Sequence, residues 1–201
     1  MTVSLPASAV PVFVHTTQND AVYVANSGNA TVSAISTSSN VITNTISVGN
    51  NPVALAETPD AKKLYVVNQG SDSVTSINLI DKSVNATINT GTSPVWAVAR
   101  SDSARVYVLN QGSGTVSSID TSSEAFTNVA VGTGANFMLY DKGRNRLYVT
   151  NPIAHTLTIL NAAVDPPASL ATIDLTAGTS PACPVAYSPV SVAVLPDGSR
   201  A

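Results

Sequence analysis

Short apolar runs alternate with short polar turns along the whole chain of 201 residues. The apolar runs are rich in Val, Ile, Tyr and Thr, which favour β-strands. The turns are rich in Asn, Asp, Gly, Ser and Pro, which preset turn geometry or bond to the local backbone. No stretch has the 3.6-residue spacing of an amphipathic helix. The pattern therefore predicts an all-β protein.

One of the apolar runs recurs at an almost fixed interval. The tetrapeptide Tyr-Val-x-Asn begins at Tyr23, Tyr65, Tyr107 and Tyr148, so the copies are 42, 42 and 41 residues apart. Such a period indicates one supersecondary unit repeated along the chain. Each unit has one strand-like run before the tetrapeptide and two after it. Four short strands in about 42 residues are typical of a β-propeller blade.

The asparagine that ends each tetrapeptide leads into a turn. Its side chain is expected to bond to the backbone two residues further on. Asp60, Asp102 and Asp197 recur in the turn before the tetrapeptide, and we interpret them as turn formers. The repeated tyrosines are interpreted as packing residues whose hydroxyls lie near the edge of a blade.

Alignment on the tyrosines treats residues 1–201 as a single repeat array. The full units span about residues 11–51, 52–93, 94–135 and 136–189, and a partial unit spans residues 190–201. The two ends resemble single strands of a blade, because residues 2–5 align with an outer strand and residues 190–195 with an inner strand. We therefore expect an incomplete propeller arc of about four full blades plus one inner and one outer strand, a fragment of a longer propeller. The alternative is a closed small ring of four or five blades.

The four tetrapeptides resemble the YVTN-type β-propeller repeat. The copies are Tyr23-Val24-Ala25-Asn26, Tyr65-Val66-Val67-Asn68, Tyr107-Val108-Leu109-Asn110 and Tyr148-Val149-Thr150-Asn151. Members of this family are secreted, periplasmic or cell-surface proteins, so the resemblance implies an extracytoplasmic protein. Related propellers occur in periplasmic oxidoreductase subunits and in sugar lactonases. The motif is specific for the fold and carries little information on activity.

Composition and charge narrow the choice of partners. Charged residues make up 10% of the chain, and the net charge is −3. Since the chain has no basic stripe that would neutralise phosphates, we do not expect it to bind nucleic acid. No apolar run approaches the roughly 20 residues that span a bilayer. The first fifteen residues do not resemble a signal peptide, and we expect a monomer.

Residues that could bind a ligand or take part in catalysis are few, and they lie where the inner strands end. His15, Glu57, Arg100 and Asp141 all lie near the outgoing ends of the inner strands, where they could ring one mouth of the central channel. The other interpretation is ordinary turn polarity. The sequence contains no zinc motif, Ca²⁺ loop, nucleophile elbow or phosphate-binding loop, so we expect no metal and no cofactor.

One insertion interrupts the period, about ten residues long, after Ile173. It is rich in proline and contains Cys183 and Tyr187. Insertions in repeat arrays form loops, often on the binding face. We expect a partner-contacting loop there, or else a neutral surface excursion.

Two functions remain open from the sequence. The first is a non-enzymatic extracytoplasmic scaffold that binds an unknown protein, glycan or small ligand. The second is part of a propeller enzyme, such as a periplasmic oxidoreductase subunit or a lactonase-like protein. The second requires charged groups that converge around the axis.

Overall fold

A computed structural model describes residues 2–176 and 188–194 of the chain. In these residues the protein is all-β, with sixteen strands and one turn of 3-10 helix, η1 (Gln69–Ser71). The strands form four antiparallel sheets of four strands each. This architecture confirms the expected four-stranded blades.

The strands follow one another in chain order within each sheet. The first two sheets consist of β1 (Pro11–Thr16), β2 (Ala21–Asn26), β3 (Thr31–Ser36), β4 (Ile42–Ser47), β5 (Pro52–Glu57), β6 (Lys63–Asn68), β7 (Ser73–Asn78) and β8 (Val84–Asn89). The other two consist of β9 (Pro94–Ala99), β10 (Arg105–Asn110), β11 (Thr115–Asp120), β12 (Phe126–Ala130), β13 (Phe137–Asp141), β14 (Arg146–Asn151), β15 (Thr156–Asn161) and β16 (Ala168–Asp174).

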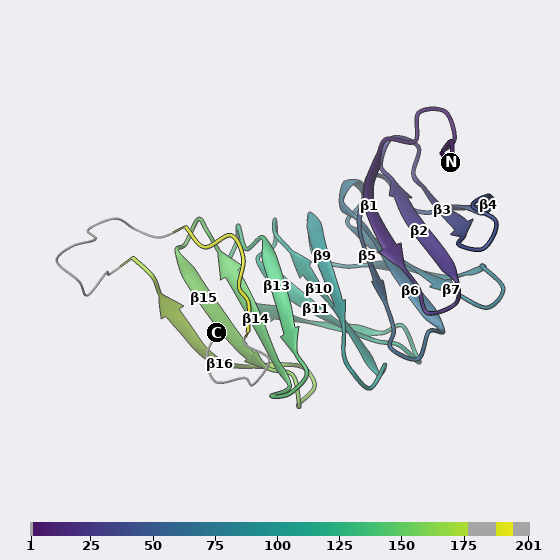
Figure 1. The fold of residues 1–201 in the computed structure, drawn as a ribbon. Helices are drawn as coiled ribbons and strands as arrows, with labels where there is room; N and C mark the ends of the chain where they lie inside the picture. The colour runs from purple at the N-terminus through teal and green to yellow at the C-terminus, as the bar shows by residue number, and fades with distance from the viewer. Residues whose placement is uncertain (1, 177–187, 195–201) are drawn as a thin grey trace.

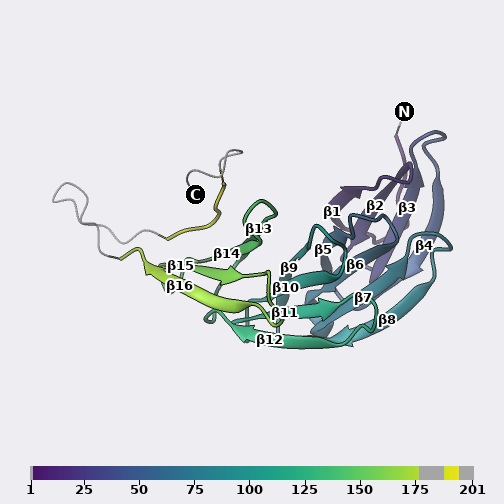
Figure 2. The ribbon, with the colours of Figure 1, turned by 90° about the horizontal axis from the view of Figure 1, so that it is seen from below.

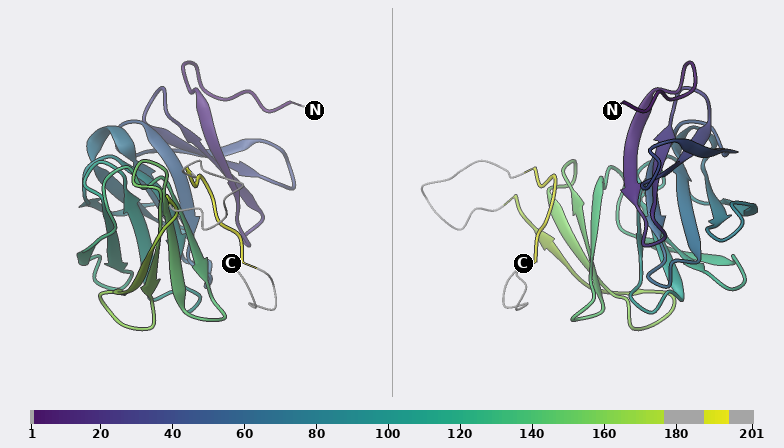
Figure 3. Two further views of the ribbon diagram at one scale, coloured as in Figure 1. Left: turned by 90° about the vertical axis from the view of Figure 1, so that its left-hand side faces the viewer. Right: turned by 45° about the vertical axis from the view of Figure 1, so that its right-hand side comes forward.

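The sheets stand side by side and form an open arc (Figures 1 and 2). The strand that begins each sheet packs against its counterpart in the next sheet, so that β1, β5, β9 and β13 line the inner side of the arc. The sheet β1–β4 and the sheet β13–β16 lie at opposite ends, as the right-hand view of Figure 3 also shows. The expected incomplete arc is therefore the observed one, and the closed small ring is not formed.

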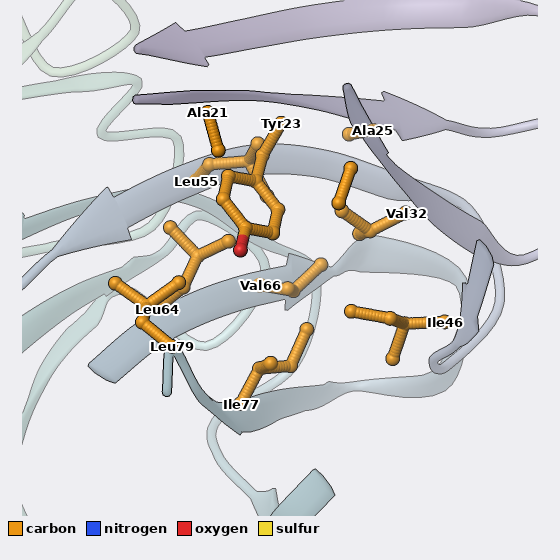
Figure 4. Packing of buried hydrophobic residues seen from close by; sticks show 11 residues of the cluster. Ala21, Tyr23, Ala25, Val32, Ile46, Leu55, Leu64, Val66, Ile77 and Leu79 are labelled. Atoms are coloured by element: carbon orange, nitrogen blue, oxygen red, sulfur yellow. The ribbon is translucent and has the colours of Figure 1, made fainter. Parts of the chain in front are cut away.

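The core consists of three layers, one between each pair of neighbouring sheets. In the first layer, the completely buried Tyr23 of β2 packs against Leu64 and Val66 of β6 (Figure 4). Tyr65 and Tyr107 occupy the same place in the other two layers and are also completely buried. A twisted sheet has two faces, and stacking covers both of them, which explains why apolar residues recur on both faces of the middle strands.

The asparagine of the tetrapeptide behaves differently from the expectation in three copies. Its side-chain amide donates hydrogen bonds across to hydroxyls on the next strand: Asn26 to Ser33 at 2.9 Å, Asn68 to Thr75 at 2.9 Å and Asn110 to Ser117 at 2.8 Å. The predicted bond to the backbone two residues on is wrong for these copies, because the side-chain amide nitrogen is turned to the hydroxyls and no described residue donates to Oδ1 of Asn26, Asn68 or Asn110.

In the fourth copy the prediction holds, because Asn151 Oδ1 accepts a hydrogen bond from the backbone amide of Ile153 at 3.0 Å. Here the turn begins Asn151-Pro152, and the side-chain amide of Asn151 turns to the carbonyl oxygen of Thr133 at 2.9 Å.

The two recurring turn aspartates in the described residues act as expected. Asp60 Oδ1 accepts from the hydroxyl of Thr58 at 2.7 Å, and Asp102 Oδ1 accepts from the backbone amide of Ala104 at 3.0 Å. Asp197 lies outside the described residues.

The two segments that resemble single strands form no strand in the described parts of the chain. Residues 2–5 and 188–194 are assigned neither strand nor bridge. A lone strand needs a hydrogen-bonding neighbour, and in the described residues neither segment has one. We attribute the difference to this missing neighbour, because the residue pattern of both segments suits a strand.

Candidate functional site

The candidate site lies where the inner strands end. The register of each inner strand on its neighbour is known, because His15, Ala56, Val98 and Leu139 each lie opposite the tyrosine of the tetrapeptide. Glu57 is one position beyond this level, and Arg100 and Asp141 are two positions beyond it. The four residues that the sequence singles out therefore occupy three levels along the channel.

Two of the four residues meet. His15 Nε2 lies 3.1 Å from Glu57 Oε2, and the two side chains come from the adjacent inner strands β1 and β5. The exposed fraction is 31% for the His15 side chain and 7% for that of Glu57. The second carboxylate oxygen, Oε1, accepts from the backbone amide of Gln18 at 3.4 Å. The pair thus joins two sheets at the mouth and leaves the imidazole within reach of solvent.

Arg100 is directed elsewhere. Its Nε donates to Asp102 Oδ1 at 2.8 Å, and its Nη1 donates to the carbonyl oxygen of Ala162 at 3.2 Å. The hydrogen bond to Asp102 raises the pKa of the Arg100 guanidinium, and the same bond lowers the pKa of the Asp102 carboxyl. Arg100 therefore ties the sheet β9–β12 to the sheet β13–β16.

Asp141 is also engaged locally. Its Oδ1 accepts from the backbone amides of Gly143 at 2.9 Å and Arg144 at 3.2 Å, as a turn-forming aspartate does. Its other oxygen lies 3.4 Å from the guanidinium of Arg144. The structure brings His15 and Glu57 together and gives Arg100 and Asp141 other partners.

A hollow of about 330 Å³ opens at the same end of the inner strands. Its lining consists of Pro59, Ala99, Ser101, Tyr140 and Lys142. The Tyr140 hydroxyl donates to Asn145 Oδ1 at 2.6 Å and lies 3.2 Å from the Ser101 hydroxyl.

One residue, Gln18, links this hollow to the His15–Glu57 pair. Gln18, whose backbone amide bonds to Glu57, donates from Nε2 to the Pro59 carbonyl oxygen at 3.4 Å. A small polar ligand in the hollow could contact a hydroxyl, a phenol and an ammonium group.

Sequence reasoning missed this hollow, although one signal was present. Tyr140 is a tyrosine outside the repeated tetrapeptide, so packing within the repeat did not account for it. Ser101 and Lys142 stand in turns, where a polar residue attracts no notice.

An aromatic row along the inner strands was also missed. Phe13, Trp96 and Phe137 occupy equivalent positions in β1, β9 and β13, while Ala54 takes that place in β5. The Trp96 ring lies 5.9 Å from Phe13 and 5.4 Å from Phe137, measured between centroids. Since Ala54 is small, Phe13 reaches past it to the ring two sheets away. The row fills the inner side of the arc below the polar mouth.

The described residues contain neither a cluster of metal ligands nor a membrane-spanning helix. No group of three or more His, Cys, Asp or Glu residues that could hold a metal ion occurs within residues 2–176 and 188–194. In the same part of the chain, no helix has the length and apolarity needed to cross a bilayer. Cys183 and Tyr187 lie outside the described residues.

Comparison with known proteins gives matches among solved structures alone. No family model and no curated protein matches the chain. The structure superimposes on hydrazine synthase from Kuenenia stuttgartiensis with a TM-score of 0.72 and 19% identity, covering 82% of this chain and 50% of that one. It also superimposes on virginiamycin B lyase from Staphylococcus aureus, here a catalytically inactive form with quinupristin, with a TM-score of 0.70 and 12% identity, covering 86% and 58%.

A third similar structure comes from Bacteroides uniformis and is described as a candidate 6-phosphogluconolactonase. Its TM-score is 0.66 at 14% identity, with 94% of this chain and 61% of that chain covered. The fold is an incomplete β-propeller. At these identities the likeness shows the fold alone. The chain spans between half and about three fifths of the length of these three propeller structures.

Proposed function

We propose that this β-propeller is a non-enzymatic extracytoplasmic scaffold that binds a small polar ligand or a glycan at the mouth of its inner strands. The observation that carries the proposal is the 330 Å³ hollow beside the His15–Glu57 pair. Ligand sites are concave and combine apolar walls with a few polar groups, and this hollow has both. The extracytoplasmic placement rests on the resemblance to YVTN-type repeats.

The test measures amide shifts of the labelled protein by NMR as two probes are added, N-acetylglucosamine trimer and citrate. One probe should shift the amides of Ser101 and Lys142 in a saturable manner. Lys142→Glu should weaken citrate binding by at least about tenfold, because it replaces an ammonium group with a carboxylate that repels the anion; Tyr140→Phe should weaken saccharide binding by about tenfold, because it removes one hydroxyl. Ser122→Ala, an exposed serine on a turn of the β9–β12 sheet, is the matched control. Absence of saturable shifts at the hollow with both probes contradicts the proposal.

A second function is favoured by the chemistry of the pair itself. A partly exposed imidazole held by a buried carboxylate is an arrangement that general acid–base catalysis uses. Propellers of similar fold include proteins named as a lyase and as a candidate lactonase. We therefore keep part of a propeller enzyme as the alternative, with His15 as the proton-transferring group and Glu57 as the positioning residue.

Hydrolysis of glucono-δ-lactone, followed by pH-stat, tests the alternative. The enzyme function predicts hydrolysis above the buffer rate, lost in His15→Asn and reduced in Glu57→Gln. Ile80→Ala, at an exposed loop position, should leave the rate unchanged. A rate equal to that of buffer contradicts lactonase activity and leaves the binding test to decide the first proposal.

A further inference from the structure

A second hollow, of about 210 Å³, lies beside the start of β12 and shares no lining residue with the hollow at the mouth. Its lining includes Arg105, Asp120 and Phe126 from the sheet β9–β12. Asp165, from the loop between β15 and β16, completes it. The hollow therefore lies where two neighbouring sheets meet, and neither of the sheets' uncovered faces at the ends of the arc takes part in it.

The guanidinium of Arg105 lies between two carboxylates of this lining. Its Nη1 pairs with Asp120 Oδ2 and its Nη2 pairs with Asp165 Oδ2. The exposed fractions of the side chains are 17% for Arg105, 30% for Asp120 and 38% for Asp165. One cation thus faces two anions, and the lining carries one net negative charge at neutral pH.

The second carboxylate is particular to this boundary between sheets. Asp120 lies opposite the first residue of the second strand, and the other three sheets have uncharged residues at that position: Ser36, Asn78 and Asn161. At the boundary between the sheets β5–β8 and β9–β12, Lys63 takes the place of Arg105 and is balanced by the single carboxylate of Glu124. One carboxylate is enough to balance the cation there, so Asp120 supplies an additional negative charge.

Three carboxylate oxygens at the hollow have room for a further hydrogen bond, because each oxygen offers about two acceptor sites. Among the described residues, Asp165 Oδ1 accepts from the Ser118 hydroxyl alone, at 3.1 Å. Asp165 Oδ2 and Asp120 Oδ2 each accept from Arg105 alone. Asp120 Oδ1, in contrast, is fully used by hydrogen bonds from Ser122 and Ser123. Three free acceptor sites beside a net negative charge match an ammonium group, which has three N–H donors.

The rest of the lining suits an alkyl chain. Ala125 and Phe126 form an apolar wall beside the carboxylates, and Phe126 is 37% exposed. A chain of methylene groups can lie along such a wall while its charged end stays with polar partners. A bare metal ion fits less well, because the hollow offers two carboxylates and Arg105 already binds one oxygen of each.

We propose that this hollow binds a primary alkylammonium group. The ammonium head lies at Asp120 and Asp165, and the alkyl chain lies on Phe126. This site is separate from the hollow at the mouth of the inner strands, so it does not depend on the function proposed for that hollow.

The test adds n-butylammonium chloride to the labelled full chain, at an ionic strength held constant with sodium chloride, and measures amide shifts by NMR. The amides of Ser123 and Phe126 should shift in a saturable manner, and n-butanol, the uncharged analogue, should not shift them. Asp165→Asn should weaken binding by at least about tenfold, since it removes the net negative charge and with it the charge-assisted hydrogen bonds. Asp81→Asn, at an exposed position in the equivalent loop of the sheet β5–β8, is the matched control.

A second variant tests the apolar wall. Phe126→Ala should weaken n-butylammonium binding by about fivefold and leave methylammonium binding unchanged, because only the longer chain reaches the ring. Circular dichroism establishes that each variant remains folded. The dipeptide analogue Nα-acetyl-lysine methylamide distinguishes the source of the group: binding at least as tight as that of n-butylammonium indicates a lysine side chain of a partner, and weaker binding indicates a free amine.

Three results would overturn the proposal. The first is the absence of saturable shifts with n-butylammonium, or equal shifts with n-butanol. The second is an equal loss of binding in Asp165→Asn and Asp81→Asn. The third is a larger response of the same amides to calcium chloride than to n-butylammonium, which would make the hollow a metal site instead.

Discussion

The hydroxyl of Tyr65 donates a hydrogen bond to Glu124 Oε2 across the boundary between two sheets, over a distance of 3.0 Å. The other oxygen of Glu124 accepts from Lys63 Nζ at 2.7 Å and from the Ser76 hydroxyl at 2.9 Å. Burial raises the pKa of the Tyr65 hydroxyl, and the neighbouring carboxylate adds to that effect. One side chain from the third sheet thus satisfies three groups of the second.

Removal of this carboxylate should destabilise the protein. We expect Glu124→Ala to lower the free energy of unfolding by about 2 kcal/mol, because Tyr65 loses its partner and the largely buried Lys63 loses its ion pair and keeps only the carbonyl oxygen of Thr121. Urea unfolding followed by circular dichroism measures the loss. Ser123→Ala, on the neighbouring exposed residue, should change it by less than about 0.5 kcal/mol. Equal effects of the two substitutions would contradict the assigned role.

Two substitutions of the buried Asn110 should destabilise the protein to different extents. Asn110 is fully buried, its amide donates to Ser117, and no described residue bonds to its Oδ1. Asn110→Ala should cost about 1 kcal/mol, since it removes the hydrogen bonds to Ser117 and Thr115 but also an unsatisfied acceptor. Asn110→Asp should cost several kcal/mol at pH 7, because it buries a charge. Thermal unfolding ranks the two; a smaller loss for Asp than for Ala would contradict the described environment.

Gly114 is expected to tolerate no side chain. Its φ is +65°, and an added Cβ would lie 2.3 Å from the backbone nitrogen of Thr133. Gly114→Ala should therefore cost about 2–3 kcal/mol, from backbone strain and the clash together. Gly143→Ala is the matched control, because the nearest atom to its Cβ would be Asp141 Oδ1 at 3.3 Å. Urea midpoints compare the two, and equal midpoints would contradict the crowding at Gly114.

We expect Asp120 to account for part of the stability that the folded protein loses in acid. The hydroxyl of Ser122 donates to its carboxylate, and this bond, with backbone amides and Arg105, lowers the pKa of Asp120. Since the folded-state pKa lies below that of the unfolded chain, this stabilisation is complete above about pH 4 and is lost as the pH falls further.

The unfolding free energy of Asp120→Asn should therefore decline less between about pH 4 and pH 2 than that of the unchanged protein. Ser122→Ala should give an intermediate slope, because it removes one of the stabilising hydrogen bonds. An unchanged slope in both variants would show that Asp120 does not contribute.

The sheets were predictable because the repeated tetrapeptide, which includes Tyr65 and Val66 in the second unit, marks the same strand in every unit. The contacts between sheets were not predictable, since Glu124 and Lys63 are 61 residues apart and each stands in an ordinary turn or strand end. The asparagine prediction was wrong for Asn26, because the sequence does not show that its side-chain amide reaches the hydroxyl of Ser33, which lies opposite Val24 on the next strand.

At the candidate site, sequence reasoning brought His15 and Glu57 together correctly, since neighbouring inner strands end at the same side. Their functional role stays a prediction. The separation of Arg100 and Asp141 from them could not be foreseen, because it depends on local partners such as Asp102, which a pattern shows only as turn polarity. Tyr140 could have been noticed, as it breaks the rule that tyrosines belong to the tetrapeptide.

Two polar contacts between sheets, Lys82 with the Tyr23 ring and Glu124 with Lys63, also bear on the order in which nearly identical sheets stack. Lys82 and Glu124 stand at equivalent loop tips with the same left-handed backbone, so their charges can differ without a change in the path of the chain. If these two tips were exchanged, Lys82 would face Lys63, and like charges would oppose the docking. The opposite charges of these two loop tips thus discriminate against exchange of the second and third sheets, a hazard for any chain whose repeats share one core pattern.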